Sequence, residues 1–155
     1  MKTFDEDFGQ VVLRRLGDVP ENAAPAWGKM TRGQAIGHLK KVLRYTLGGG
    51  PDVPFKGNAK TRYIFKHVIL LGLREIPHNV RAAAPKGVSQ EQMFAETPLE
   101  DLEAAIQEYL ARAKTGDLPP RMHPYFGILT GPQWQRFHRL HTIHHLKQFG
   151  VGDGL

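Results

Sequence analysis

The stretch from Thr130 to Gly150, TGPQWQRFHRLHTIHHLKQFG, is the feature that most constrains how this chain can fold. Thr130 and Gln133 cap its start, and its residue pattern predicts one amphipathic helix that carries four histidines. His141 and His145 are four residues apart. On a helix they therefore lie about 40° apart around the axis and roughly 6 Å apart along it. Two imidazoles placed in this way can approach one metal ion from the same face. A pair cannot complete a metal site, so we expect a third ligand from elsewhere in the chain.

We assign the third ligand to His38, on a second predicted helix. Thr31 and Gln34 have the spacing of a capping box, which marks a helix N-terminus. Apolar residues at helical spacing then form a face that we expect to be buried: Ala35, Ile36, Leu39, Val42, Leu43 and Leu47. His38 stands at the edge of this apolar stripe, where a ligand donated across a helical bundle is expected. We therefore predict that His38, His141 and His145 hold one divalent metal ion.

The last helix carries two further histidines. His144 is rotated about 100° from His145, so we interpret it as a contact to a metal ligand or to another helix. His138 lies one turn before His141 and could also face the site, in poorer geometry than the i, i+4 pair. A lone histidine is more often a solvated or core side chain. A buried uncharged pair without partners is costly, however, and a metal ion supplies those partners.

Two glutamines lie one helical turn from predicted ligands. Gln34 precedes His38 by one turn, and Gln148 follows His145 by one turn. We expect either amide to orient a ligand or a substrate. His67 and His78 have no such pattern around them, and we expect both to be surface residues without partners.

Other metal-site patterns do not match the chain. A di-iron bundle needs Glu-x-x-His on two helices, and the match from Glu75 to His78 is broken by Pro77. A zincin needs H-E-x-x-H, but Thr142 stands where the glutamate would be. Three neutral histidines on one ion remain the simplest solution. Such a ligand set suits zinc, nickel, iron and copper alike, and among these we expect zinc or nickel.

Helix signals along the chain indicate an all-α protein. The predicted helices run from Phe4 to Leu16, from Thr31 to Leu47, from about Thr61 to Arg74, from Thr97 to about Gly116, and from Thr130 to Gly150. The fourth of these is expected to begin with Thr97 as N-cap, Pro98 in the first position and Glu100 as the capping glutamate. Four long helices and one short one predict a four-helix bundle that forms a single domain over residues 1–155.

Long loops connect these helices. The segment from Asn79 to Glu96 has little periodicity, and we expect an ordered excursion over the surface, of the kind that often covers a site. The segment from Leu118 to Leu129 is also expected to be a loop. It contains the motif HPYFG, whose Tyr125 and Phe126 can plug the core. No segment alternates with the period of a strand.

The composition of the chain restricts the cellular compartment and the binding partners that we expect. The chain has no cysteine, which excludes disulfides and thiolate metal sites. It has no signal-peptide pattern and no apolar run near the ~20 residues that cross a bilayer, so we expect a soluble, cytoplasmic protein without a membrane partner. The net charge of +6 raises nucleic acid as a partner. The basic half of the chain has no nucleic-acid-binding motif, however, and a solvated basic face or an anionic small molecule explains the charge better.

Several motifs together resemble those of the DinB-like family of metal-binding helical bundles. The similar segments are Trp27-Gly28-Lys29-Met30, His38-Leu39, the HPYFG motif from His123, Trp134, and the HxxHHLxQFG block from His141 to Gly150. The similarity spans most of the chain, and the C-terminal block is specific. It implies a four-helix bundle, often dimeric, with a divalent ion held by one histidine of the second helix and two of the last. On this chain those positions are again His38, His141 and His145.

The resemblance also suggests a class of activity. DinB-like relatives include transferases and isomerases that use low-molecular-weight thiols. We therefore expect a metal-dependent thiol transferase, or a related enzyme, that acts on small molecules, with catalytic residues unassigned. The alternative is a metal-binding or stress-response bundle without catalysis. Lys147 stands where many relatives carry an arginine.

Overall fold

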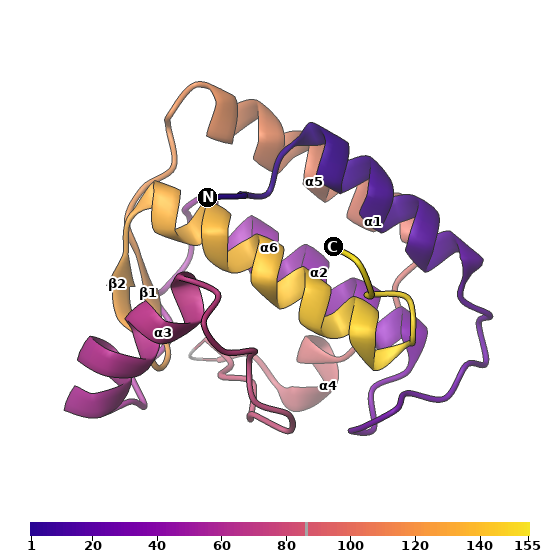
Figure 1. The fold of residues 1–155 in the computed structure, drawn as a ribbon, viewed down its shortest axis with the longest axis horizontal. Coiled ribbons are helices and arrows are strands. Elements are labelled where there is room, and N and C mark those ends of the chain that lie inside the picture. Colours follow the sequence, from indigo (N-terminus) through magenta and orange to yellow (C-terminus); the bar gives the residue numbers. More distant parts are fainter. Residues whose placement is uncertain (86) are drawn as a thin grey trace.

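Four long helices form the framework of the structure, which is a computed structural model that describes residues 1–85 and 87–155 (Figure 1). They are α1 (Glu6–Asp18), α2 (Arg32–Thr46), α5 (Leu99–Lys114) and α6 (Gly131–Gln148). α1 contacts α5 and α6, and α2 contacts the same two helices. The prediction of a mostly helical protein is confirmed.

The helix starts follow from local hydrogen bonds. The capping boxes predicted at Thr31 and Thr130 are both present, with the threonine hydroxyl and the glutamine side chain bonded reciprocally to the backbone. The predicted cap of α5 is wrong. The hydroxyl of Thr97 donates to the carbonyl of Ala95, and Pro98 takes the cap position without a side-chain bond. Proline has no N–H and is tolerated where the helix begins, so α5 starts at Leu99 without that cap.

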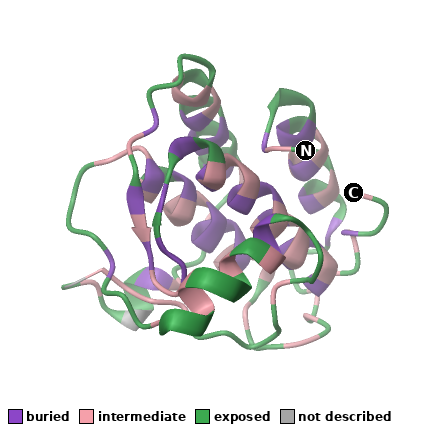
Figure 2. Ribbon diagram, turned by 60° about the vertical axis from the view of Figure 1, so that its left-hand side comes forward, coloured by how far each residue is buried: buried purple, intermediate pink, exposed green. Residues whose placement is uncertain are grey.

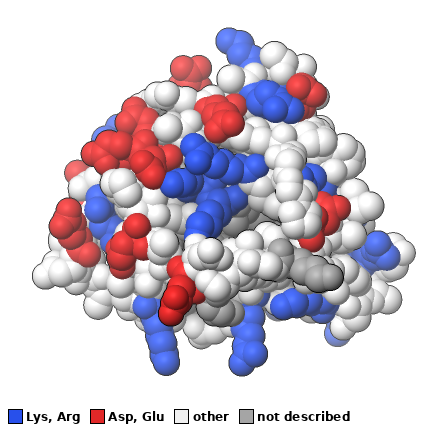
Figure 3. Space-filling view, turned by 180° about the vertical axis from the view of Figure 1, so that it is seen from behind, with Lys and Arg blue, Asp and Glu red and all other residues white. Residues whose placement is uncertain are grey.

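The main core lies between the four long helices. Its buried members come from all four of them and from flanking segments: Phe4, Phe8, Val12, Leu16, Ile36, Leu39, Leu43, Leu102, Ile106, Tyr109, Leu118 and Leu146. On the face opposite to that of Figure 1, basic and acidic side chains lie next to one another (Figure 3). Lys40 of α2 pairs with Asp101 of α5 at 2.7 Å. Such solvent-exposed pairs contribute little stability, so the apolar core holds the helices together.

The short helix after residue 60 differs from the prediction. It consists of a π-helical segment, η1 (Thr61–Phe65), followed by α3 (Lys66–Leu70). It ends before the predicted Arg74 because the chain turns at Gly72, whose φ of 73° lies in the left-handed region. A second correction concerns the expected loop from 79 to 96. A short helix, α4 (Gln90–Met93), lies within it.

The expected loop around HPYFG is a small β-hairpin. β1 (Arg121–His123) pairs antiparallel with β2 (Gly127–Leu129), with Met122 opposite Ile128. Strands of three residues are too short for an alternating pattern to be visible in the sequence. Gly127 has a φ of 75°, which a glycine adopts without strain. Phe126 is buried in a second apolar cluster, as the predicted plug requires.

Burial is concentrated on the inner faces of the long helices, while much of η1, α3 and the connecting loops is exposed (Figure 2). Within the described part of the chain, no helix has both the length and the apolar character needed to cross a bilayer.

Candidate metal centre

The side chains of His38, His141 and His145 converge between α2 and α6. The Nε2 atom of His141 lies 3.1 Å from Nε2 of His38 and 3.1 Å from Nε2 of His145. Each histidine offers one ring nitrogen, and these three atoms all lie within 4.8 Å of one another. The structure therefore brings together the three residues that the sequence singled out, from two helices about one hundred residues apart.

The backbone around His38 is held close to the segment that follows α4. The N–H of Thr97 donates to the carbonyl of Gly33, which lies in the first turn of α2, before His38. A Cβ on Gly37 would lie 2.7 Å from the carbonyl oxygen of Ala95, so only glycine permits this close approach. The contact places the ring of Phe94 next to that of His38, with the ring centroids 6.3 Å apart.

Hydrogen bonds define the protonation of His145. The amide of Gln148 donates from Nε2 to the carbonyl of Trp27 at 2.8 Å, which orients its Oε1 toward the histidine. That Oε1 lies 3.0 Å from Nδ1 of His145, so Nδ1 must carry the proton. The lone pair of His145 is therefore on Nε2, where it points toward His141. This is the tautomer that a metal ligand needs.

Burial keeps all three imidazoles neutral. Removal from water lowers the pKa of His38 to about 4, with a smaller contribution from the nearby Lys41 ammonium. Burial also holds the pKa values of His141 and His145 well below their usual range, and the neighbouring histidines lower them further. At neutral pH each ring thus has a free nitrogen lone pair.

Hydrogen bonds between the three histidines cannot satisfy all of their facing ring nitrogens. Nε2 of His141 carries at most one proton, so it cannot form a full hydrogen bond to both of its neighbours at 3.1 Å. A bound cation accepts all three lone pairs. Metal–nitrogen bonds of about 2.0–2.1 Å at angles of roughly 100–110° would place the nitrogens about 3.1–3.4 Å apart. The two separations of 3.1 Å from His141 fit such an ion, and the group contains no carboxylate.

Aromatic rings flank the three histidines. The ring of Phe137 stacks on His141 with a centroid distance of 5.1 Å and an interplanar angle of 15°. Phe94 covers His38 at an interplanar angle of 25°. These apolar neighbours limit the access of water to the ring nitrogens, which strengthens electrostatic interactions at the centre.

His138 does not face the three histidines, which corrects the prediction that it could. Its Nε2 lies 2.9 Å from the hydroxyl of Thr46, which itself donates to the carbonyl of Leu43. His138 must therefore be the donor, and its ring packs against Tyr109 at 4.8 Å. Burial lowers its pKa to about 3. His138 is a neutral core residue that ties α6 to α2.

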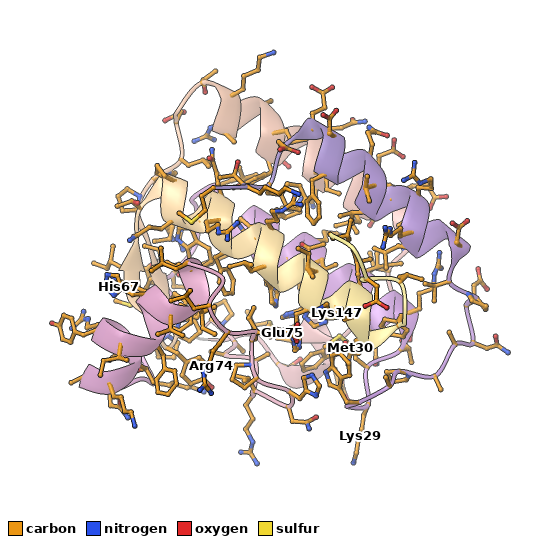
Figure 4. The ribbon with its side chains drawn as sticks, viewed as in Figure 1. Lys29, Met30, His67, Arg74, Glu75 and Lys147 are labelled. Atoms are coloured by element: carbon orange, nitrogen blue, oxygen red, sulfur yellow. The ribbon has the colours of Figure 1, made fainter. Side chains whose placement is uncertain are left out.

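His144 and His78 lie outside the three-histidine cluster, beside Trp27. The ring of His78 stacks on Trp27 at 3.8 Å with an interplanar angle of 3°, and His144 packs edge-on against Trp27 at 5.5 Å. The expectation that His78 has no partner is therefore wrong. Next to them, Lys147 forms an ion pair with Glu75, and the two side chains lie close together in Figure 4.

Gln34 and His67 do not contribute to the histidine cluster. The side chain of Gln34 accepts a hydrogen bond from the backbone N–H of Thr31, so it is engaged in the cap of α2 rather than in orienting a ligand. His67 is exposed and lies toward the outer end of the α3 region, away from Lys147 (Figure 4).

Sequence reasoning missed three contributors to the site. The carbonyl of Trp27 orients Gln148, and Phe94 and Phe137 cover the ligands. The sequence marked Trp27 only through the WGKM motif, whose residue types predict no metal-binding or catalytic role. Gly28 explains part of the motif, because its φ of 75° and the close approach of the Gln148 amide both favour glycine.

Comparison with known proteins gives a family for this chain. The family described as "Protein of unknown function (DUF1569)" matches residues 8–151. The comparisons found no matching curated protein and no matching solved structure. The matched region includes all three histidines of the cluster.

The buried neutral histidines predict a pH dependence of stability. Because His138 has a pKa near 3 when folded and near 6.5 when unfolded, only the unfolded chain binds its proton between these values. The free energy of unfolding of the metal-free protein should therefore fall as the pH drops below about 6.5. His138→Gln, whose amide can still donate to Thr46, should reduce this slope by up to about 1.4 kcal/mol per pH unit. Urea unfolding at several pH values measures it. The exposed His67→Gln serves as control, and an equal slope change in both variants would contradict the assignment.

Proposed function

This chain belongs to the DUF1569 family, and we propose that it is a divalent-metal-binding protein that acts as a metal-dependent thiol transferase, or a related enzyme, on small molecules. His38, His141 and His145 would hold the ion. The observation that most supports the proposal is the contact of His141 Nε2 with two other ring nitrogens, each at 3.1 Å. A cation can accept the lone pairs of all three nitrogens, whereas one proton on His141 can serve only one of the two contacts.

The helix arrangement supports a DinB-like four-helix bundle. α1 and α2 each contact both α5 and α6, which gives the closed set of neighbours expected of such a bundle. The three histidines also come from the second and the last of these four long helices, as the resemblance to DinB-like proteins implies.

The ligand set supports a catalytic role, because neutral ligands do not offset the charge of a metal ion. Three neutral imidazoles leave the ion its full positive charge, and they leave coordination positions for water or substrate. An ion bound here would lower the pKa of a coordinated water or thiol toward neutrality and so supply a nucleophile. Within the protein, Gln148 holds His145 in the binding tautomer, while Phe94 and Phe137 keep water from the ring nitrogens.

The second candidate is a metal-stabilised bundle without catalysis. The observation that favours it is the enclosure of the ligands, because only 7% of His38 and 7% of His145 is exposed and aromatic rings cover two of the three histidines. Enclosure of this kind hinders the approach of a substrate, as is expected of a structural site.

Metal content distinguishes the proposed ligands from other histidines. We expect His141→Ala to lose most of the bound metal, because it removes the nitrogen that contacts both other ligands. The measurement is elemental analysis of purified protein. His67→Ala, at an exposed position, should retain the wild-type content. Full metal retention in the His141 variant would refute the site.

Gln148 tests the role of the hydrogen bond behind His145. Gln148→Met keeps the shape of the side chain but removes the acceptor for Nδ1, so metal affinity should fall roughly ten- to hundredfold. Competition with a chromophoric chelator gives this affinity. Gln107→Met, an exposed change on α5, is the matched control. Unchanged affinity in the Gln148 variant would show that the bond does not support the ligand.

A thiol-conjugation assay separates the two candidate functions. We expect metal-loaded protein to accelerate the reaction of a small thiol with 1-chloro-2,4-dinitrobenzene. In this reaction the sulfur bonds to the ring carbon, chloride leaves with the bonding electrons, and the thiol proton passes to solvent. The rate is followed by absorbance with a panel of thiols. Metal-loaded protein that binds its ion but gives no rate above that of His141→Ala would favour the non-catalytic candidate.

A further inference from the structure

The segment formed by η1 and α3 presents large apolar side chains to solvent, away from the histidine cluster. η1 contains no buried residue, and Tyr63 and Ile64 are 66% and 55% exposed. The last residues of the segment, Ile69 and Leu70, pack in the second apolar cluster. Figure 2 shows the rest of this segment as partly exposed and exposed ribbon on the outside of the molecule. π-Helical segments are rare and occur frequently at functional sites.

Neighbouring elements extend this apolar surface. Backbone and side-chain contacts bring residues 55–62 against the hairpin, since the N–H of Lys56 donates to the carbonyl of Pro124 and the Arg62 guanidinium lies against Gly127. We define the exposed apolar face as the large hydrophobic side chains of this region: Phe55, Tyr63, Ile64, Phe65, Leu71, Leu73 and Ile128. Apart from these residues, the described chain exposes large hydrophobic side chains at Met1 and Val80.

The chain segment that carries most of the exposed apolar face has basic side chains and no acidic ones. Residues 53–74 contain five basic side chains, Lys56, Lys60, Arg62, Lys66 and Arg74, and no aspartate or glutamate. The two acids that flank the segment are already paired elsewhere, Asp52 with Arg121 and Glu75 with Lys147. Within the described residues, none of the five cations forms a salt bridge. Lys60 and Arg62 instead lie over the rings of Phe65 and Phe55.

This charge argues against a second copy of the chain as the occupant. In a symmetric dimer the same patch meets itself, so the five cations of one copy would face the five of the other without an acid between them. A homodimer would therefore have to use another face. The required partner is anionic and also accepts aliphatic side chains.

We propose that the exposed apolar face binds peripherally to an anionic lipid bilayer. Aromatic and aliphatic side chains would enter the boundary between headgroups and acyl chains, and the lysines and arginines would contact anionic headgroups. The aliphatic residues Ile64, Leu73 and Ile128 favour lipid over nucleic acid, because bases stack on aromatic rings and not on branched alkyl groups. Binding of this kind lies on the membrane surface and needs no spanning helix, and it departs from the sequence-based expectation of no membrane partner. It is independent of metal binding.

Vesicle binding tests the proposal on the full chain. The probes are vesicles of phosphatidylglycerol and phosphatidylcholine, compared with vesicles of phosphatidylcholine alone, in a co-sedimentation assay. We expect wild-type protein to sediment with the anionic vesicles and to remain in solution with the neutral ones. Tyr63→Ser/Ile64→Ser should weaken binding about tenfold or more, because it removes apolar area from exposed positions that the fold does not depend on.

Charge variants provide a matched control. Lys56→Gln/Lys60→Gln should weaken binding roughly twentyfold or more, at about fivefold per lysine near an anionic surface. Lys2→Gln/Lys29→Gln lowers the net charge equally at exposed positions outside the segment and should have a much smaller effect. Equal weakening by both pairs, or no preference for anionic vesicles, would overturn the proposal.

Two other occupants have distinct signatures. A wild-type dimer that Tyr63→Ser/Ile64→Ser converts to a monomer in light scattering, without vesicle binding, would assign the face to a second copy and overturn the proposal. Binding to an oligonucleotide that weakens steeply with salt, without vesicle binding, would assign it to nucleic acid and overturn it as well.

Discussion

The close approach of α2 and α6 is the constraint on which the candidate site depends. It places three ring nitrogens together, which is costly without a shared partner because His38 and His145 are buried, His141 is partly buried, and all three imidazoles are neutral. The apolar core on the neighbouring faces of these helices, with Ile36 and Leu146 fully buried, supplies the stability that maintains the approach. The contact of Gly37 with the backbone at Ala95 then brings Phe94 over His38. Packing thus determines both the cluster and its shielding from water.

Burial alone does not distinguish a candidate ligand from a structural histidine on α6. The pKa values of His138 and His141 are both lowered mainly by burial. The difference lies in their partners. His138 donates to a hydroxyl that is already committed to a backbone carbonyl, so its hydrogen bond is complete. His141 meets two other imidazoles and cannot satisfy both with one proton. His123 of the hairpin resembles His138, since its Nδ1 accepts from the backbone N–H groups of Tyr125 and Phe126 and organises the turn.

The histidine cluster and the exposed apolar face occupy different elements and follow different physical rules. The cluster lies on long helices that are buried on one side, where low exposure strengthens specific contacts. The exposed apolar face lies on and around a short helical segment whose last residues are buried, and the cations of residues 53–74 have no acidic partners among the described residues. A protein that carried both functions could bring a metal-dependent reaction to a membrane surface without a spanning segment.

The sequence by itself determined the local features of this protein. Capping boxes at Thr31 and Thr130, helical apolar spacing and the i, i+4 pair of histidines depend on neighbours within one helix, so they predicted α2, α6 and the residues of the cluster. Only the tertiary structure decided which way His138 and His78 face, that Trp27 orients Gln148, and that HPYFG forms a hairpin. These features depend on partners far away in the chain. Side-chain spacing determines the face of a helix, whereas packing between helices determines what that face meets.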